Sequence, residues 1–441
     1  MKNIVGDFEK MLTHYASSSP ARFHMPGHKG LLGSPLDVTE LSATDNLHSP
    51  QNAITALEEN FAKAYQARHS FLLVNGSTSG IHAFLLALGT NKTIIVSREC
   101  HRSIIHGAAL CDDEVIFTPA QSASDMETAL KTAPSVDAVI LTSPDYYGRC
   151  ADIERIADIV HSHNALLFVD SAHGAHFPFC DELPRFPHEK VDMWCVSAHK
   201  TLDALTQSAI LNLGSCCPFS VEQIRNVLML ENTSSPSFLL MLSLEKALFD
   251  AQSGAWNTHV NRIKAVRQRI LHTFDDIAPD AFENSDITRL CLDVSRTGNT
   301  GYEAALFLEK SNIFCECANE THIILITTPS DLDEWYERLI FALASLERKP
   351  VDSSLFTAVP KSAGHFSMSI RKAMFSEVEY VPLEKCAGRI SAVCLGIYPP
   401  GSPLVAPGEK MLAETVDYLV KHEEIFSDTY GTVNGCVPCV K

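Results

Sequence analysis

The sequence predicts an α/β protein in which a mainly parallel sheet covered by helices is followed by smaller α+β units. Short apolar segments alternate with amphipathic segments between residues 50 and 250. This alternation is typical of parallel strands joined by helices. After residue 250 the helical patterns lengthen, and only two strand patterns lie between them. A segment rich in Pro and Gly at 398–408 indicates a rigid loop near the end of the chain.

The first helix of the sheet region is predicted at Ser49–Ala67. Ser49 is a favourable N-cap residue, and Pro50 suits the first helical position. Four apolar residues share one face at helical spacing: Ile54, Leu57, Phe61 and Ala64.

Six short apolar segments then predict strands that are buried on both faces. They are Phe71–Val74, Thr93–Val96, Val139–Leu141, Leu166–Val169, Met193–Val196 and Ile210–Leu213. An amphipathic helix is predicted at Ile153–His161, between two of these strands.

The region after residue 250 predicts a smaller α+β unit. Helices are predicted at Leu242–Phe249, His259–Phe274 and Asp331–Leu346, and strands at Leu290–Val294 and Ile323–Ile326. The apolar face of the last helix should contain Leu332, Trp335, Leu339, Leu343 and Leu346. Residues 349–360 resemble a linker.

Composition excludes several classes of function. The net charge of −18 argues against a nucleic-acid partner, because phosphate binding needs clustered Lys and Arg. No apolar signal core and no long apolar run is present, so we expect no membrane span and a cytoplasmic protein.

The 14 cysteines are scattered, and we interpret them as reduced thiols. Cys436 and Cys439 form a Cys-x-x-Cys pair, but no second pair completes a zinc set. Cys315 and Cys317 look like strand residues. We therefore expect no metal centre.

Three segments that follow predicted strands carry groups suited to one cofactor. Lys200 follows Met193–Val196, and a desolvated lysine amine can form a Schiff base with an aldehyde. Asp170 follows Leu166–Val169, where a buried carboxylate needs a partner such as a protonated pyridine nitrogen. His173 lies three residues further on, where it would orient Asp170 or contact the cofactor's phenolic oxygen.

The third segment is Asn75–Gly80, between a strand and an apolar helix. Its Gly76, Ser77 and Thr78 suit either a simple helix cap or a phosphate cradle. Because ligands of open α/β sheets bind at the carboxyl ends of strands, the three segments together point to pyridoxal 5′-phosphate.

Other candidates are less specific. His101, after Thr93–Val96, is either a loop residue or a group that stacks on the cofactor ring. The polar turn Thr233–Ser237 is either a helix cap or a second phosphate contact. Asp145–Gly148 ends a strand with two tyrosines that would wall the site, and the basic, Gly-rich segment Arg22–Gly30 precedes the first helix of the sheet region.

Read in order, these segments resemble the bacterial ornithine/lysine/arginine decarboxylase family. The resemblance rests on Arg22–Gly30, Thr44–His48, Asn75–Gly80, Cys100–Ser103, Asp170–His176, Ser197–Lys200, Leu205–Ser208, Ala387–Ala392, Tyr398–Gly401 and Pro407–Glu409. It implies the aspartate-aminotransferase-like fold (fold type I) of pyridoxal-phosphate-dependent transferases. The Arg22–Gly30 motif comes early, so the chain resembles the short members without a receiver-like domain.

The resemblance also implies a domain plan. An N-terminal segment (1–48) would precede a large pyridoxal-phosphate-binding domain (49–250). A small α+β domain (251–350) and an α+β C-terminal domain of the decarboxylase type (351–441) would follow.

By the same resemblance, Lys200 is the Schiff-base lysine and Asp170 the partner of the pyridine nitrogen. His101 would stack on the ring, and His173 would lie near the ring oxygen. The phosphate and the Schiff base would be served by Ser77, Thr78, Ser197 and His199. Ser234 and Ser235 would reach the phosphate of a neighbouring subunit, which implies a homodimer with shared active sites.

The implied activity is decarboxylation of arginine, lysine or ornithine to the corresponding polyamine-related amine and CO₂. Two alternatives stay open. The same lysine, aspartate and phosphate turn serve other pyridoxal-phosphate reactions, such as transamination or aldol-type cleavage. Asp145 and Ser171 differ from the residues usual in the family, so a non-catalytic, polyamine-binding regulator is the second alternative.

Overall fold

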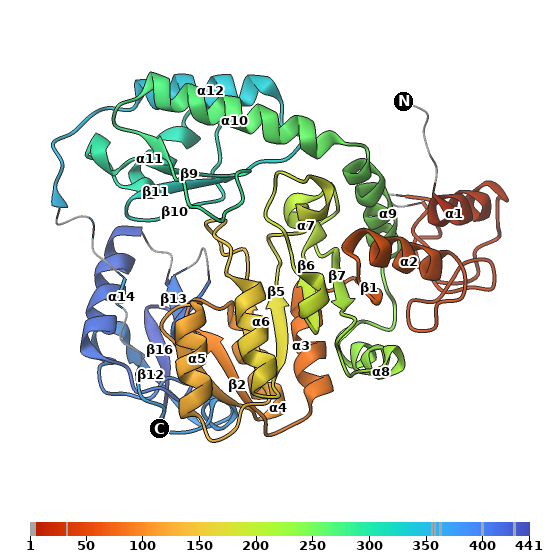
Figure 1. Ribbon diagram of the computed structural model, residues 1–441, viewed down its shortest axis with the longest axis horizontal. Coiled ribbons are helices and arrows are strands. Elements are labelled where there is room, and N and C mark those ends of the chain that lie inside the picture. The colour runs from red at the N-terminus through yellow and green to blue at the C-terminus, as the bar shows by residue number, and fades with distance from the viewer. Residues whose placement is uncertain are drawn as a thin grey trace. The chain divides into compact units, whose positions relative to one another are not determined.

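The computed structural model describes residues 6–31, 34–353, 356, 359–360, 364–397, 401–426 and 429–441 (Figure 1). Its largest sheet has seven strands in the order β1-β7-β6-β5-β4-β2-β3, which confirms the predicted α/β class. The chain divides into two compact units, residues 1–88 with 152–258 and residues 89–151 with 259–441.

Four strands of the large sheet belong to the first unit. They are β1 (His69–Leu73), β5 (Leu166–Asp170), β6 (Met193–Val196) and β7 (Ala209–Leu213). β5 and β6 are parallel, whereas β7 is antiparallel to both β6 and β1. The sheet is therefore mainly, but not wholly, parallel. Every residue of β6 and β7 is buried, as the continuous apolar segments predicted.

The first unit also contains helices. They are α1 (Asp7–Ser17), α2 (Ala53–Tyr65), α3 (Gly76–Leu88), α6 (Ile153–Ser162), α7 (Ala198–Thr201), α8 (Val221–Glu231) and α9 (Phe238–Gln252), with short 3₁₀ turns at Phe177–Phe179 and His188–Lys190. Gly80 lets α3 pack closely on the sheet, since a Cβ there would lie 3.0 Å from Leu73 Cδ1 and 3.2 Å from Cys195 Cβ.

The predicted start of α2 is wrong. Residues 49–52 are not helical, the helix begins at Ala53, and its N-cap, Asn52, makes no side-chain capping bond. Instead, the buried carboxylate of Asp45 accepts the backbone N–H groups of Gln51, Asn52 and Ile54. A long-range acceptor thus replaces the local cap that the Ser-Pro pattern indicated.

The second unit holds the other three strands of the large sheet: β2 (Thr93–Ser97), β3 (Glu114–Thr118) and β4 (Ala138–Thr142). β2 pairs in parallel with both β3 and β4. Strand β3 was not predicted; it begins with an exposed Glu114 and is only partly buried, unlike the strands with continuous buried segments. Helices α4 (Arg102–Cys111) and α5 (Ala123–Thr132) connect these strands.

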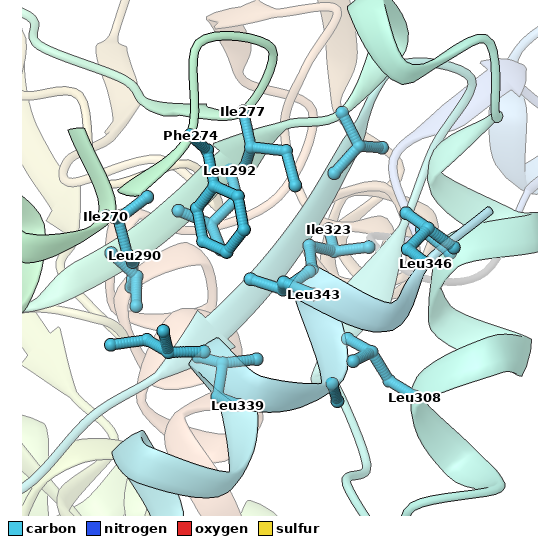
Figure 2. Close-up of a cluster of buried hydrophobic side chains, with 14 of the residues drawn as sticks. Ile270, Phe274, Ile277, Leu290, Leu292, Leu308, Ile323, Leu339, Leu343 and Leu346 are labelled. Carbon is cyan, nitrogen blue, oxygen red and sulfur yellow. The ribbon is translucent and has the colours of Figure 1, made fainter. Parts of the chain in front are cut away.

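An antiparallel sheet of order β10-β11-β9-β8 forms the predicted smaller α+β part. Its elements are β8 (Ala278–Pro279), β9 (Arg289–Asp293), a 3₁₀ turn (Ser295–Thr297), α11 (Gly301–Glu309), β10 (Cys317–Ala318) and β11 (His322–Ile326), with α10 (Ala255–Thr273) and α12 (Asp333–Ser345). Leucines and isoleucines of these elements form one buried cluster around Phe274 (Figure 2).

Two details of the prediction for this region are corrected. On α12, Leu332 and Trp335 are about half exposed, and the buried face uses Tyr336 and Ile340 in their place. Cys317 lies in β10, but Cys315 precedes the strand.

The C-terminal part contains two further small sheets. Strand β12 (Val378–Pro382) pairs with β16 (Cys436–Val440), and β13 (Leu395–Ile397) lies between β14 (Pro403–Val405) and β15 (Thr429–Tyr430). Helices α13 (Ile370–Met374) and α14 (Ala413–Phe426) and a 3₁₀ turn (Leu383–Lys385) complete it. Residues 398–400 of the Pro/Gly segment lie outside the described residues.

The cysteines are all free thiols. The Cys439 side chain of the Cys-x-x-Cys pair contacts Cys386. Their sulfur atoms lie 4.0 Å apart inside the C-terminal core. Among the helices that the structure describes, none is long and apolar enough to cross a bilayer.

Replacing Asp45 with Ala should destabilise the protein by about 2 kcal/mol, because several backbone N–H groups at the start of α2 lose their acceptor. Urea unfolding would measure the change. Asp7→Ala, at an exposed acidic position in the first turn of α1, is the matched control and should cost less than about 0.5 kcal/mol. Equal losses in both variants would contradict the capping role.

Candidate functional site

Lys200 lies in α7, a single helical turn that follows directly on β6. Its backbone N–H donates to the carbonyl of Ser197, which closes this turn. The side chain is partly buried, and Nζ lies 3.1 Å from Nε2 of His173. The amine and the imidazole therefore share a hydrogen bond at the carboxyl end of β6.

Asp170 is the last residue of β5 and is 3 % exposed. One oxygen, Oδ1, accepts the backbone N–H of Ala172 at 3.1 Å and the thiol of Cys195 at 3.7 Å. Burial raises the pKa of the Asp170 carboxyl above its ordinary value, while the positive charge of Lys200 and these two bonds oppose the rise. The carboxylate thus has few donors of its own and depends on a nearby cation.

The register of β5 and β6 explains why the two groups lie together. Asp170 is directly opposite Cys195, and the strands are parallel. Both chains therefore leave the sheet at the same edge, Asp170 at the end of β5 and Lys200 in the turn after β6.

The N-terminus of α3 supplies a potential anion site. The helix begins at Gly76, whose φ of 70° is unfavourable for other residues, and whose N–H donates to the carbonyl of Gln207. The hydroxyl of Ser197 donates to that of Ser77 at 2.9 Å. This contact brings the first turn of α3 beside the segment that carries Lys200. Thr78 belongs to the same turn.

His199 is held as a neutral ring. Its Nδ1–H donates to the backbone carbonyl of Ser208 at 2.9 Å, and that carbonyl also accepts the His199 backbone N–H. Burial lowers the pKa of His199, which favours the uncharged ring. With Nδ1 engaged as a donor, Nε2 is the basic nitrogen.

Two partners in this cluster, Cys195 and Ser208, were given no role from the sequence, although Ser208 ends the Leu205–Ser208 motif. The signal that identifies them is strand pairing. Cys195 is opposite Asp170, and Ser208 directly precedes β7, the antiparallel neighbour of β6. Burial raises the pKa of the Cys195 thiol well above its ordinary value, so this thiol is a hydrogen-bond donor to Asp170.

Different contacts are described for three further predicted site residues. His101 belongs to the second unit, where its ring caps α4 by accepting the N–H of Ser103. Ser234 and Ser235 are exposed in the turn before α9, and the N–H of Ser235 donates to Thr233 Oγ1. The roles expected of these three residues stay predictions.

Two further segments have structural contacts of their own. Asp145 closes a turn after β4: its carboxylate accepts the N–H groups of Tyr147 and Arg149 and pairs with the Arg149 guanidinium at 2.6 Å. Tyr146 and Tyr147 line a cavity of about 350 Å³ in the second unit. In the Arg22–Gly30 segment, His28 contacts Asp37 at 3.0 Å.

The cluster in the first unit fits pyridoxal phosphate. An aldehyde needs the amine of Lys200, and a pyridine nitrogen suits the buried carboxylate of Asp170. A phosphate suits the N–H groups at the start of α3, beside Ser77 and Ser197.

Comparison with protein families gives two matches along this chain. The model of the "Orn/Lys/Arg decarboxylase, major domain" matches residues 33–291, and that of the "Orn/Lys/Arg decarboxylase, C-terminal domain" matches residues 349–432. Together they cover the Lys200 cluster and the C-terminal sheets except for β16.

Curated relatives and solved structures show the same similarity to decarboxylases. The chain is 30 % identical to the Bacillus subtilis "Uncharacterized protein YaaO" and 28 % identical to the arginine decarboxylase of the same organism, covering 93 % of this chain and 92 % of each relative. The structure of Escherichia coli constitutive lysine decarboxylase superimposes with a TM-score of 0.81 at 18 % identity, over 100 % of this chain and 82 % of that one. The predicted fold type I is thereby confirmed.

Replacing Asp170 with Asn should stabilise the cofactor-free protein at neutral pH by about 1 kcal/mol, because the variant keeps the bond from Ala172 and removes a buried charge. The pKa of Asp170 is higher in the folded chain than in the unfolded chain. Wild-type stability should therefore fall relative to the variant as pH rises above about 3.9, the pKa of an aspartate in an unfolded chain.

Urea unfolding between pH 4 and 8 would measure this difference. Asp181→Asn, at an exposed position of the same unit, is the control and should show no such trend. A variant that is less stable than the wild type at every pH would contradict the inferred cost of burying the Asp170 charge.

Proposed function

Because the chain belongs to the Orn/Lys/Arg decarboxylase family, we propose that it is a pyridoxal-phosphate-dependent decarboxylase of a basic L-amino acid. The family and its structural neighbours depend on this cofactor. The observation that carries the proposal is the cluster at the ends of β5 and β6, where the Lys200 amine acts electrostatically on the buried carboxylate of Asp170. Few structural roles would place an aspartate there with so few donors.

The bound cofactor supplies an electron sink for the carbanion left when CO₂ departs. The residues of this chain bind and orient it. Lys200 would hold the aldehyde carbon of the cofactor, and Asp170 would keep the ring nitrogen protonated. Ser77, Thr78, Ser197 and the N–H groups that follow Gly76 bind the phosphate.

Proton transfer falls to two groups beside the reacting carbon. The proposed donors to Cα are Lys200 Nζ and His199. The neutral His199 has its Nδ1–H engaged by Ser208, so proton exchange takes place at Nε2. His173, in contact with Lys200 Nζ, orients the amine and would lie near the ring oxygen of a bound cofactor.

Arginine is the proposed substrate, and lysine and ornithine are the other candidates. Support comes from the similarity over nearly the whole length to a protein named arginine decarboxylase. The products would be agmatine and CO₂, and the amine links the enzyme to polyamine metabolism.

The proposal includes a cytoplasmic homodimer. Ser234 and Ser235 are exposed in a turn, and the hydrogen bond described there is made by the backbone N–H of Ser235. Their hydroxyls are therefore accessible to the phosphate of a neighbouring subunit. His101 is proposed to stack on the cofactor ring. The free thiols of all the cysteines support a reducing compartment.

Lys200→Ala should abolish the visible absorption band of the lysine-bound cofactor and reduce turnover by at least about 1,000-fold, because the amine both holds the cofactor and moves a proton. Spectrophotometry and CO₂ release would measure the two effects. Lys246→Ala, at an exposed position of α9, is the control and should retain both. An unchanged band in Lys200→Ala would disprove the cofactor assignment.

Among arginine, lysine and ornithine, arginine should give the highest kcat/KM, with CO₂ and agmatine released in equal amounts. Amine analysis alongside CO₂ detection would establish this. A keto acid without CO₂ would instead indicate a transaminase. A normal cofactor band without turnover of any basic amino acid would indicate a regulatory protein.

A further inference from the structure

A second cluster of potential ligands lies at the amino end of β6, the end opposite to Lys200. His161, Asp192 and Cys216 each place one ligand atom within 4.8 Å of the other two. Asp192 directly precedes β6, and Lys200 follows its last residue by four positions. The cluster is therefore separate from the proposed cofactor site, by about the 13 Å length of a four-residue strand.

Strand pairing fixes the position of Asp192 and the path of the chain toward Cys216. Asp192 donates its N–H to the carbonyl of Leu167 on β5, and its carbonyl accepts the N–H of Gly214 after β7. Gly214 has no space for a side chain, since a Cβ there would lie 1.9 Å from the carbonyl oxygen of Val191. This close approach sets the path of the chain two residues before Cys216.

The third residue and the loop are also anchored. His161 comes from the last turn of α6, and its Nε2 lies 2.9 Å from Asp192 Oδ2. Arg68 donates to the backbone carbonyls of Cys217 and Phe219, which holds the loop after Gly214 in place.

The ligand types match a borderline-soft transition ion. Imidazole nitrogen, carboxylate oxygen and thiolate sulfur are the three donors that zinc uses in proteins. Two ligands of one tetrahedral zinc ion lie roughly 3.3–3.8 Å apart, as follows from its bond lengths. A span of 4.8 Å or less needs only small side-chain rotations to reach that geometry.

The cluster also has the features expected of a site that an ion can enter. Asp192 is buried and oriented by the N–H of Leu167, so it is a preorganised ligand. His161 is 35 % exposed and Cys216 is exposed, which gives access from solvent. Three protein ligands leave the fourth position for water.

We propose that His161, Asp192 and Cys216 bind one Zn²⁺ ion per chain. Binding forms bonds from zinc to His161 Nε2, one Asp192 oxygen and Cys216 Sγ. The hydrogen bond between His161 and Asp192 is replaced, the proton on His161 Nε2 moves to Nδ1 by exchange with solvent, and the Cys216 thiol proton passes to solvent. The ion joins the end of α6, the start of β6 and the loop after β7.

Equilibrium dialysis of the untagged, cofactor-loaded protein against Zn²⁺, followed by metal analysis, tests the site. The wild type should retain one more zinc ion per chain than His161→Ala or Cys216→Ser. Second-sphere substitutions weaken metal sites by about 10–100-fold, so loss of a direct ligand should weaken binding by at least about 100-fold. His163→Ala, an exposed histidine two residues along the chain, is the matched control and should bind like the wild type.

A second measurement identifies the thiolate. Co²⁺ substituted for zinc should give the visible absorption of a tetrahedral site, with a thiolate charge-transfer band that Cys216→His loses while it still binds metal. The absorption band of the cofactor reports on the other end of β6 and should be the same in all variants. Because metal binding is measured without turnover, a failure of the proposed catalysis would leave this result unaffected. Equal zinc uptake by wild type, His161→Ala and Cys216→Ser, with the fold intact by circular dichroism, would overturn the proposal.

Discussion

The burial of the Asp170 carboxylate beside Lys200 is the constraint on which the candidate site depends. A charge at the end of an interior strand is costly without a partner, and the pKa of Asp170 is raised for this reason. The parallel register of β5 and β6 then brings the lysine to the same edge of the sheet. In this way the sheet, rather than any loop, determines the separation of the two groups that the proposed chemistry needs.

The packing of α3 extends this constraint to the phosphate. Gly80 allows the helix to lie close to β1 and β6, and the Ser77–Ser197 bond joins its first turn to the lysine segment. Gly76 provides the backbone conformation that starts the helix directly after the strand. One small residue in the helix and one at its start therefore place an anion-binding helix end against a rigid strand end.

Much of this could be predicted from the sequence, because it depends on local patterns. The buried strands have continuous apolar segments, and Lys200, Asp170 and Gly76 follow them directly. What could not be predicted depends on long-range pairing. The cap of α2 is Asp45 rather than Ser49. Strand β3 begins with a charged residue and is only partly buried. The contacts of Cys195 and Ser208 emerge only once the strands are aligned. The exposed side of α12 was misassigned because apolar spacing does not reveal which residues another element covers.

Three buried carboxylates of the first unit show how structural and functional roles can be separated. Asp45 accepts four backbone N–H groups, from Asn46, Gln51, Asn52 and Ile54, so its negative charge is balanced by the helix start and the turn before it. Asp192 accepts the N–H of Leu167 and contacts the His161 ring, which leaves it partly balanced. Asp170 has a single backbone donor and a weak thiol donor.

The fewer backbone donors a buried carboxylate has, the more its stability depends on a cation that the fold does not itself supply in full. By this criterion Asp45 is a structural group, whereas Asp192 and Asp170 are suited to a bound ion and a protonated cofactor ring. The two ends of the same parallel strand pair thus present carboxylates that require a ligand. Both carboxylates accept one backbone N–H and contact one side-chain donor, so it is the adjacent lysine and helix terminus that suit the Asp170 end to catalysis.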